Sequence, residues 1–160
     1  MRILLKFELA CSPDAAWTAL RSPSVFRSVA RPFTTFKAID PPKFPEVWGD
    51  TPVRVSVRAL GFIPIGEQVI DISTRTLARP GKGDVRLVRD SGGGLTGPLA
   101  LVTSWQHTMA VSPAPDGRTL YRDQLNFGAG ILGPLFWPVY WAFWQWRANK
   151  IRSRSKRWRA

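Results

Sequence analysis

The chain has 160 residues, of which 44% are hydrophobic, and its formal net charge is +12. This length and apolar content fit a single folded domain over residues 1–160 and exclude a disordered chain. The only cysteine, Cys11, excludes an internal disulfide and a cysteine-based zinc cluster within one chain.

The first 30 residues predict one strand followed by two short helices. Apolar and polar residues alternate over residues 2–9, as in a half-buried strand. The apolar run there is too short for a signal peptide, so we expect a cytoplasmic protein. Ser12, Pro13 and Asp14 provide a hydroxyl, a proline at a first helical position and an acid in the first turn, which predicts a helix start. A second short helix is expected over residues 24–29.

A series of strands separated by turns follows. Predicted strands cover residues 35–39, 52–58, 65–76, 84–90, 99–111 and 119–127, and a proline-rich loop over residues 41–52 contains Trp48. Short turns between strands favour an antiparallel sheet in which consecutive strands pair. We therefore predict an α+β fold with a curved antiparallel sheet of about six or seven strands, whose apolar face is covered by one long C-terminal helix.

Residues 92–97 match the dinucleotide pattern G-x-G-x-x-G, but their context is wrong. The last glycine of that motif opens a helix, whereas here Pro98 and a strand-like segment follow. We interpret the segment as a flexible loop between strands. The sequence has no P-loop and no nucleophile elbow, and its single histidine excludes a histidine cluster for a metal, so we expect no cofactor and no metal site.

The C-terminal segment predicts a long helix that is regular from about Pro138, because a proline inside a helix lacks the amide hydrogen that should bond back. Residues spaced by four and three form one stripe along it: Trp137, Trp141, Trp144, Ala148, Ile151, Ser155 and Trp158. The apolar run over residues 131–146 is shorter than a membrane span and is interrupted by two prolines.

Basic residues are concentrated at the end of this helix, in a tail over about residues 147–160. The last acidic residue is Asp123, and residues 147–160 contain seven basic residues. Three interpretations stay open. The aromatic half packs into the sheet while the basic half is solvated; or the helix binds an anionic membrane surface peripherally; or the tail binds nucleic acid, which no motif supports. The candidates for a membrane or anion surface are Arg147, Lys150, Arg154, Lys156 and Arg157.

This order of elements resembles the START-like superfamily, also called SRPBCC or the birch-pollen-allergen, helix-grip fold, in particular its bacterial members. The resemblance rests on the strand leading into residues 12–17, on residues 121–127 leading to Gly133-Pro134-Leu135, and on the basic C-terminal helix. It implies a sheet wrapped around the long helix and an apolar cavity between them. Members of the superfamily bind lipids, sterols or polyketides, and a minority catalyse cyclisation or dehydration without a shared catalytic residue.

We therefore expect binding of a hydrophobic small molecule or lipid rather than catalysis. The alternatives are a membrane-surface or protein-interaction module that uses the C-terminal helix, and an enzyme of the cyclase or dehydratase kind. The expected cavity wall consists of Val55, Val57, Ile70, Trp105, His107, Tyr121, Leu125, Trp137, Tyr140 and Trp141.

His107 and Asp123 are the only catalytic candidates. Alternation places both on the inner faces of their strands, where a buried aspartate needs an arginine or the His107 ring as a partner. A pair of this kind serves catalysis or simply completes a polar core, and the sequence leaves both open. The acidic residues Glu67 and Asp71 line either the cavity or the solvent.

Overall fold

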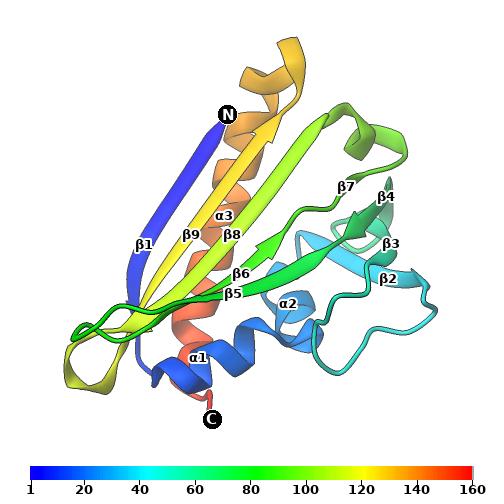
Figure 1. Ribbon diagram of the computed structural model, residues 1–160. Coiled ribbons are helices and arrows are strands. Elements are labelled where there is room, and N and C mark those ends of the chain that lie inside the picture. The colour runs from blue at the N-terminus through cyan, green and yellow to red at the C-terminus, as the bar shows by residue number, and fades with distance from the viewer. Residues whose placement is uncertain (160) are drawn as a thin grey trace.

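The computed structural model describes residues 1–159 and shows an α+β fold (Figure 1). The strands are β1 (Arg2–Leu9), β2 (Thr34–Asp40), β3 (Val53–Ala59), β4 (Ile63–Ile70), β5 (Ile72–Leu77), β6 (Val85–Asp90), β7 (Gly93–Gly94), β8 (Ser104–Pro113) and β9 (Thr119–Gly128). The helices are α1 (Pro13–Leu20), α2 (Pro23–Ala30) and α3 (Gly133–Ser155), with 3-10 turns η1 (Gly97–Leu101), η2 (Pro115–Gly117) and η3 (Gly130–Leu132). The predicted fold class is confirmed.

The strands form two antiparallel sheets. The larger has the order β1-β9-β8-β6-β5 and the smaller the order β2-β3-β4-β7. The chain passes from one sheet to the other at Asp71, so the single strand predicted over residues 65–76 is wrong. The backbone amide of Asp71 donates to Oδ1 of Asp90 at 3.0 Å, which holds the chain at this break.

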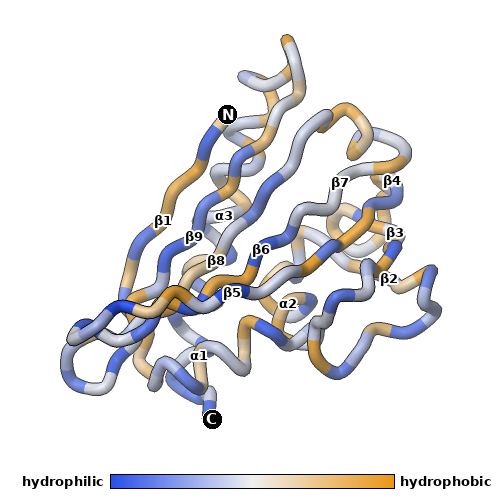
Figure 2. The backbone as a smooth tube through the Cα atoms, in the orientation of Figure 1, coloured by the Kyte–Doolittle hydropathy of each residue, from blue (hydrophilic) through white to orange (hydrophobic). Residues whose placement is uncertain are grey.

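The strands of the larger sheet have one buried and one more exposed face. Buried and half-buried residues alternate without exception along β9, as strand geometry requires when one face packs on a core. Hydropathy alternates less regularly than burial (Figure 2), because Ile3, Leu4 and Leu5 follow one another in β1 and residues 121–124 of β9 are all hydrophilic. In Figure 1, α3 runs along one face of this sheet, and α1 and α2 lie near the C-terminal end of α3.

Helix α3 starts at Gly133, five residues before the predicted regular start. Pro138 lies in the second turn and has no amide hydrogen to donate to the carbonyl of Pro134, four residues earlier. Pro134 is an exposed residue of the first turn, so the helix tolerates this loss. No helix in residues 1–159 is long and apolar enough to cross a membrane.

The row of residues predicted to share one side of the C-terminal helix, from Trp137 to Trp158, is buried only in part. Trp144, Ala148, Ile151 and Ser155 are buried, but Trp137 and Trp141 are 37% and 46% exposed and stack on each other. The start of α3 projects beyond the N-terminal end of β1, so its first turns have little sheet to pack against (Figure 1). The basic half, by contrast, is not a solvated extension, because one of its sides lies in the core.

The glycine-rich segment is closely packed and is not a flexible loop. Residues 93–94 pair with β4, and the amide of Leu95 donates to the carbonyl of Glu67 at 2.7 Å. A Cβ atom on Gly92 or Gly94 would overlap a carbonyl oxygen, of Val69 or Leu99 respectively. These glycines are therefore explained by close backbone approach rather than by a nucleotide.

Candidate functional site

Polar residues of three adjacent strands meet under α3. Asp90 of β6 lies opposite His107 of β8, and one row further Met109 of β8 lies opposite Asp123 of β9. Alternate residues of a strand share a face, so all four side chains point to the same side of the sheet. Tyr121 follows on that face of β9, two residues before Asp123.

Asp123 is the centre of a buried hydrogen-bond network. Its Oδ1 accepts from Nε2 of His107 at 2.8 Å and from the indole of Trp144 at 2.9 Å. Its Oδ2 accepts from the hydroxyl of Tyr121 at 2.6 Å and from Nη1 of Arg147, with which it forms an ion pair. All five side chains are buried. This satisfies the carboxylate and provides the counter-charge that a buried arginine requires.

The surroundings fix the charge state of the network. Burial by itself would raise the pKa of Asp123, but interaction with His107 and Arg147 outweighs it, so the pKa lies below its ordinary value. Burial, and then the charge of Asp123, raises the pKa of Tyr121 well above its ordinary value. Burial would lower the pKa of Arg147, but Tyr121 and Asp123 raise it. The site therefore holds an ionised carboxylate, a charged guanidinium and a neutral phenol.

The network also assigns the tautomer of His107. An ionised carboxylate only accepts hydrogen bonds, so Nε2 of His107 carries the proton that lies between it and Asp123. In the neutral ring Nδ1 then keeps a lone pair, and no hydrogen bond within residues 1–159 involves it. A histidine held by a carboxylate on one nitrogen and free on the other has the geometry of a hydrogen-bond acceptor or a general base.

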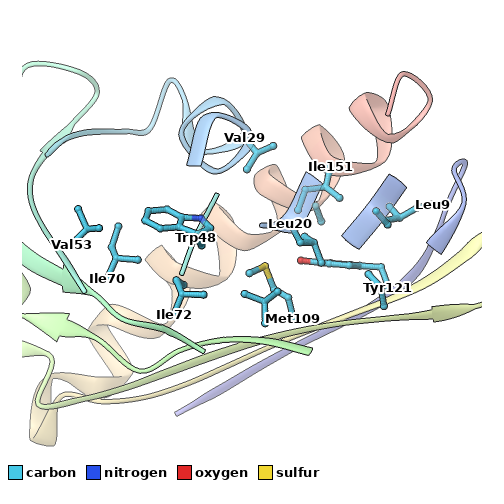
Figure 3. Close-up of a cluster of buried hydrophobic side chains, with 14 of the residues drawn as sticks. Leu9, Leu20, Val29, Trp48, Val53, Ile70, Ile72, Met109, Tyr121 and Ile151 are labelled. Atoms are coloured by element: carbon cyan, nitrogen blue, oxygen red, sulfur yellow. The ribbon is translucent and has the colours of Figure 1, made fainter. Parts of the chain in front are cut away.

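An interior cavity of about 30 Å³ adjoins this network, between the larger sheet, α1, α2 and α3. Its polar walls are Asp90, His107 and Arg147. The other lining residues are Ala19, Leu20, Val25, Phe26, Val29, Trp48, Ile70, Ile72, Met109, Ile151 and Trp158. Figure 3 shows side chains from the helices, the sheet and the Trp48 loop converging here. The volume corresponds to one or two water molecules, so side chains fill most of the space between sheet and helix.

Asp90 is the second buried carboxylate on this wall. Its Oδ1 accepts from the amides of Asp71 and Gly92 at 3.0 and 3.1 Å, and its Oδ2 accepts from the indole of Trp105 at 3.4 Å. Burial raises its pKa, although these hydrogen bonds and His107 oppose the rise. Unlike Asp123, Asp90 forms no ion pair with any residue from 1 to 159.

The ten residues expected to form the cavity wall are divided among several environments. Ile70 and His107 line the cavity, and Tyr121 belongs to the network behind it. Val55 and Val57 are buried in the main core, whereas Trp105, Leu125 and Tyr140 pack in a second cluster around Trp144. Trp137 and Trp141 lie outside, so their assignment to the wall is wrong.

The expected anion surface also needs one correction. Arg147 is only 6% exposed and pairs with Asp123, so it cannot contact a membrane or a soluble anion. Composition assigned it to the basic tail, but its position on the helix turns it inward. Lys150, Arg154, Lys156 and Arg157 face outward, with Lys150 half-buried over the ring of Trp146.

Sequence reasoning missed Asp90, Met109 and the α2 side chains of the cavity wall. A signal existed for Asp90, which shares a strand face with the buried Val88. Glu67 lies away from the cavity and pairs with Arg54 at 3.7 Å. Within residues 1–159, no group of three histidine, cysteine, aspartate or glutamate side chains could hold a metal ion.

Comparison with known proteins supports the architecture. No protein-family model matches the sequence, and no curated protein matches it. Among solved structures, truncated norcoclaurine synthase from Thalictrum flavum is similar at a TM-score of 0.61 and 15% identity, covering 99% of this chain and 95% of that one. A hypothetical protein from Helicobacter pylori reaches 0.65 at 10% identity, over 97% and 88% of the two chains. The Aha1 dimer from Colwellia psychrerythraea reaches 0.60 at 10% identity, over 98% and 97%. The chain therefore has the helix-grip fold of the START-like proteins that its sequence resembles.

Proposed function

We propose that the chain binds a compact, largely apolar small molecule carrying a hydroxyl group, in the interior cavity beside His107. The observation that carries the proposal is that His107 lines a mainly apolar cavity while Asp123 holds its Nε2 and no hydrogen bond within residues 1–159 involves its Nδ1. A lone pair in such a place favours a ligand that donates one hydrogen bond and buries the rest of its surface.

The chemistry of the wall supports this choice. Asp123 holds the His107 ring from behind, and Arg147 is occupied by Asp123 and by the sulfur of Met109 at 3.0 Å. A ligand therefore meets hydrogen-bond acceptors at His107 and Asp90 and mainly apolar surface elsewhere. A structure of norcoclaurine synthase with dopamine and hydroxybenzaldehyde, at a TM-score of 0.57 and 16% identity, is a precedent for small aromatic molecules in this fold.

Binding requires the cavity to widen, because its present volume of about 30 Å³ is well below that of a benzene ring. An apolar cavity of roughly 150 Å³ is enough to bind benzene. Trp48, from the loop over residues 41–52, and Phe26 both line this cavity, and they contact each other edge to face with centroids 5.8 Å apart. Displacement of these two rings is the simplest way to make room.

The test is a titration of the isotope-labelled protein with p-cresol and with toluene, which differ by one hydroxyl, followed by NMR. We expect p-cresol to shift the signals of Val29, Ile70 and Met109 and to bind more tightly than toluene. In His107→Phe the preference should disappear. Trp48→Ala, which enlarges the cavity, should bind both probes more tightly than wild type. The proposal would be refuted if the signal shifts were confined to surface residues. It would also be refuted if neither wild type nor Trp48→Ala showed shifts up to the solubility of the probes.

Acid–base catalysis is the second candidate, and the pairing of Asp123 with His107 favours it. Nδ1 of His107 would take a proton from a carbon next to a carbonyl group, leaving the electron pair in an enolate, and return it on reprotonation. With a small ketone in heavy water, this predicts deuterium uptake at that carbon by mass spectrometry. Uptake no faster than in His107→Gln or in buffer would exclude the activity.

A further inference from the structure

One side of α3 presents an apolar end and a basic end in line. Leu135, Val139, Trp146 and Lys150 follow spacings of four and seven residues, which place them on the same side of the helix. Leu135 and Val139 are 67% and 65% exposed, far more than side chains that pack on a core. Ile131, in the turn just before the helix, is 97% exposed. The α3 stripe, as we call Leu135, Val139, Trp146 and Lys150, therefore changes from aliphatic to cationic along its length.

Helix α2 completes a basic groove beside the cationic half. Ser24, Arg27, Ser28 and Arg31 share one side of α2 or its end and line a surface groove with Lys150 and Arg154 of α3. Nη1 of Arg154 donates to Oγ of Ser28 at 2.7 Å, which joins the two helices. Among residues 1–159, no carboxylate lines this groove.

The four cations of the groove have no carboxylate partner in the part of the chain that the structure describes. None of the ion pairs within residues 1–159 includes Arg27, Arg31, Lys150 or Arg154. Like charges held this close repel one another unless an anion lies between them. The groove and its two serine hydroxyls therefore suit phosphate groups, which accept several hydrogen bonds at once.

Aromatic side chains connect the apolar end with the groove. The indole of Trp146 donates to the carbonyl of Arg31 at 3.2 Å, and its ring packs edge to face on Phe33, which is 42% exposed. The ammonium of Lys150 lies over the ring of this indole, 4.7 Å from the centroid. Tryptophan between aliphatic and cationic residues is typical of the boundary between lipid tails and headgroups.

We propose that the α3 stripe and the basic groove together bind a membrane surface that contains anionic phospholipids. The helix lies parallel to the surface, with Ile131, Leu135 and Val139 among the acyl chains and the groove on lipid phosphates. Nucleic acid would use the cations but leave three aliphatic side chains without a partner. A second copy of the chain would bring the unneutralised cations of two grooves together.

The experiment is flotation of the purified protein with vesicles of phosphatidylcholine alone or mixed with phosphatidylglycerol. We expect flotation only with the mixed vesicles, decreasing as salt is added. Lys150→Glu/Arg154→Glu should weaken binding at least about tenfold, on the basis of the contribution of each basic residue near an anionic surface. Leu135→Ser/Val139→Ser should weaken it by a similar factor, because apolar burial is lost.

A matched variant separates this site from the overall positive charge. Arg79→Glu/Lys82→Glu changes the net charge by the same amount at two exposed residues near the β5–β6 turn and should bind like wild type. Equal loss in this control, or undiminished flotation of Leu135→Ser/Val139→Ser, would overturn the proposal. So would release of the bound protein by inorganic phosphate at constant ionic strength, or by RNA, since either would assign the groove to a soluble anion. Circular dichroism should show that all three variants fold.

Discussion

Replacement of Asp123 by asparagine tests whether the buried network stabilises the fold. The amide has nearly the same size, but it is neutral and turns one accepting oxygen into a donor, which faces Arg147 and Tyr121 or else His107 and Trp144. Arg147, only 6% exposed, then keeps a buried charge without a counter-ion. Removal of one partner of such a pair costs about 3–5 kcal/mol. At about 2–4 °C per kcal/mol for a domain of this size, the melting temperature should fall by roughly 6–20 °C.

Urea unfolding followed by tryptophan fluorescence and by circular dichroism measures this change, and agreement of the two signals tests two-state behaviour. The single variant Arg147→Met and the double variant Asp123→Asn/Arg147→Met complete a double-mutant cycle. The double variant, which has neither charge, should be more stable than the sum of the single changes predicts, by about 1–3 kcal/mol. Asp84→Asn, at an exposed aspartate, should change stability by no more than about 0.5 kcal/mol. A loss below about 1 kcal/mol in Asp123→Asn, or strict additivity, would refute the reasoning.

The dependence of stability on pH in the acid range gives an independent check on the same residue. The pKa of Asp123 is lowered in the folded protein, so its ionisation stabilises the fold above the ordinary aspartate value of about 3.9. This contribution decreases as the pH falls below that value towards the folded pKa. The gap in stability between wild type and Asp123→Asn should therefore be constant near neutral pH and narrow only below about pH 4.

Three further predictions concern other parts of the molecule. Burial raises the pKa of Asp90, so its ionisation destabilises the fold. The stability measured by urea unfolding should therefore decrease as the pH rises from about 4 through the pKa of Asp90 in the folded protein. This decrease should be absent in Asp90→Asn. Gly92→Ala should lower stability by more than about 2 kcal/mol because the new Cβ overlaps a carbonyl of β4, whereas Gly49→Ala, in open space, should change it little. Trp144→Ala should lose about 3–5 kcal/mol in the same assay, and Trp141→Ser, at an exposed position, less than about 1 kcal/mol.

Strand periodicity accounts for what the sequence predicted well. Alternation along residues 119–127 identified the buried face of β9 and so placed Asp123 inside, and the same reasoning placed His107. It could not give the register between β8 and β9, which aligns Asp123 with Met109 and brings His107 within hydrogen-bond distance on the diagonal. Their encounter depends on strand pairing, which a single sequence leaves open.

The errors on α3 have a different origin. Helical spacing showed that Trp137, Trp141 and Trp144 share a side, but not how far the sheet extends along the helix. Trp144 is buried and its indole donates to the carboxylate of Asp123, whereas the indole of Trp137 donates to the carbonyl of Arg2 on the edge strand β1 and its ring stays partly exposed. Composition likewise grouped Arg147 with the basic tail, although its partner lies on a strand 24 residues earlier in the chain. Burial of a charge depends on such long-range partners, and local patterns do not reveal them.

Helix α2 belongs to both proposed sites. Val25, Phe26 and Val29 line the interior cavity, while Arg27 and Ser28 line the basic groove on the opposite side of the same helix. Helix α3 also lines both sites, but α2 is only two turns long, and the cavity beneath it must widen before a ligand fits, so a displacement of α2 would alter both sites. Linkage then makes any effect reciprocal: if anionic vesicles change the affinity for p-cresol, p-cresol must change the affinity for the vesicles by the same factor. Equal affinities with and without vesicles would mean that α2 keeps one position and that the two sites act independently.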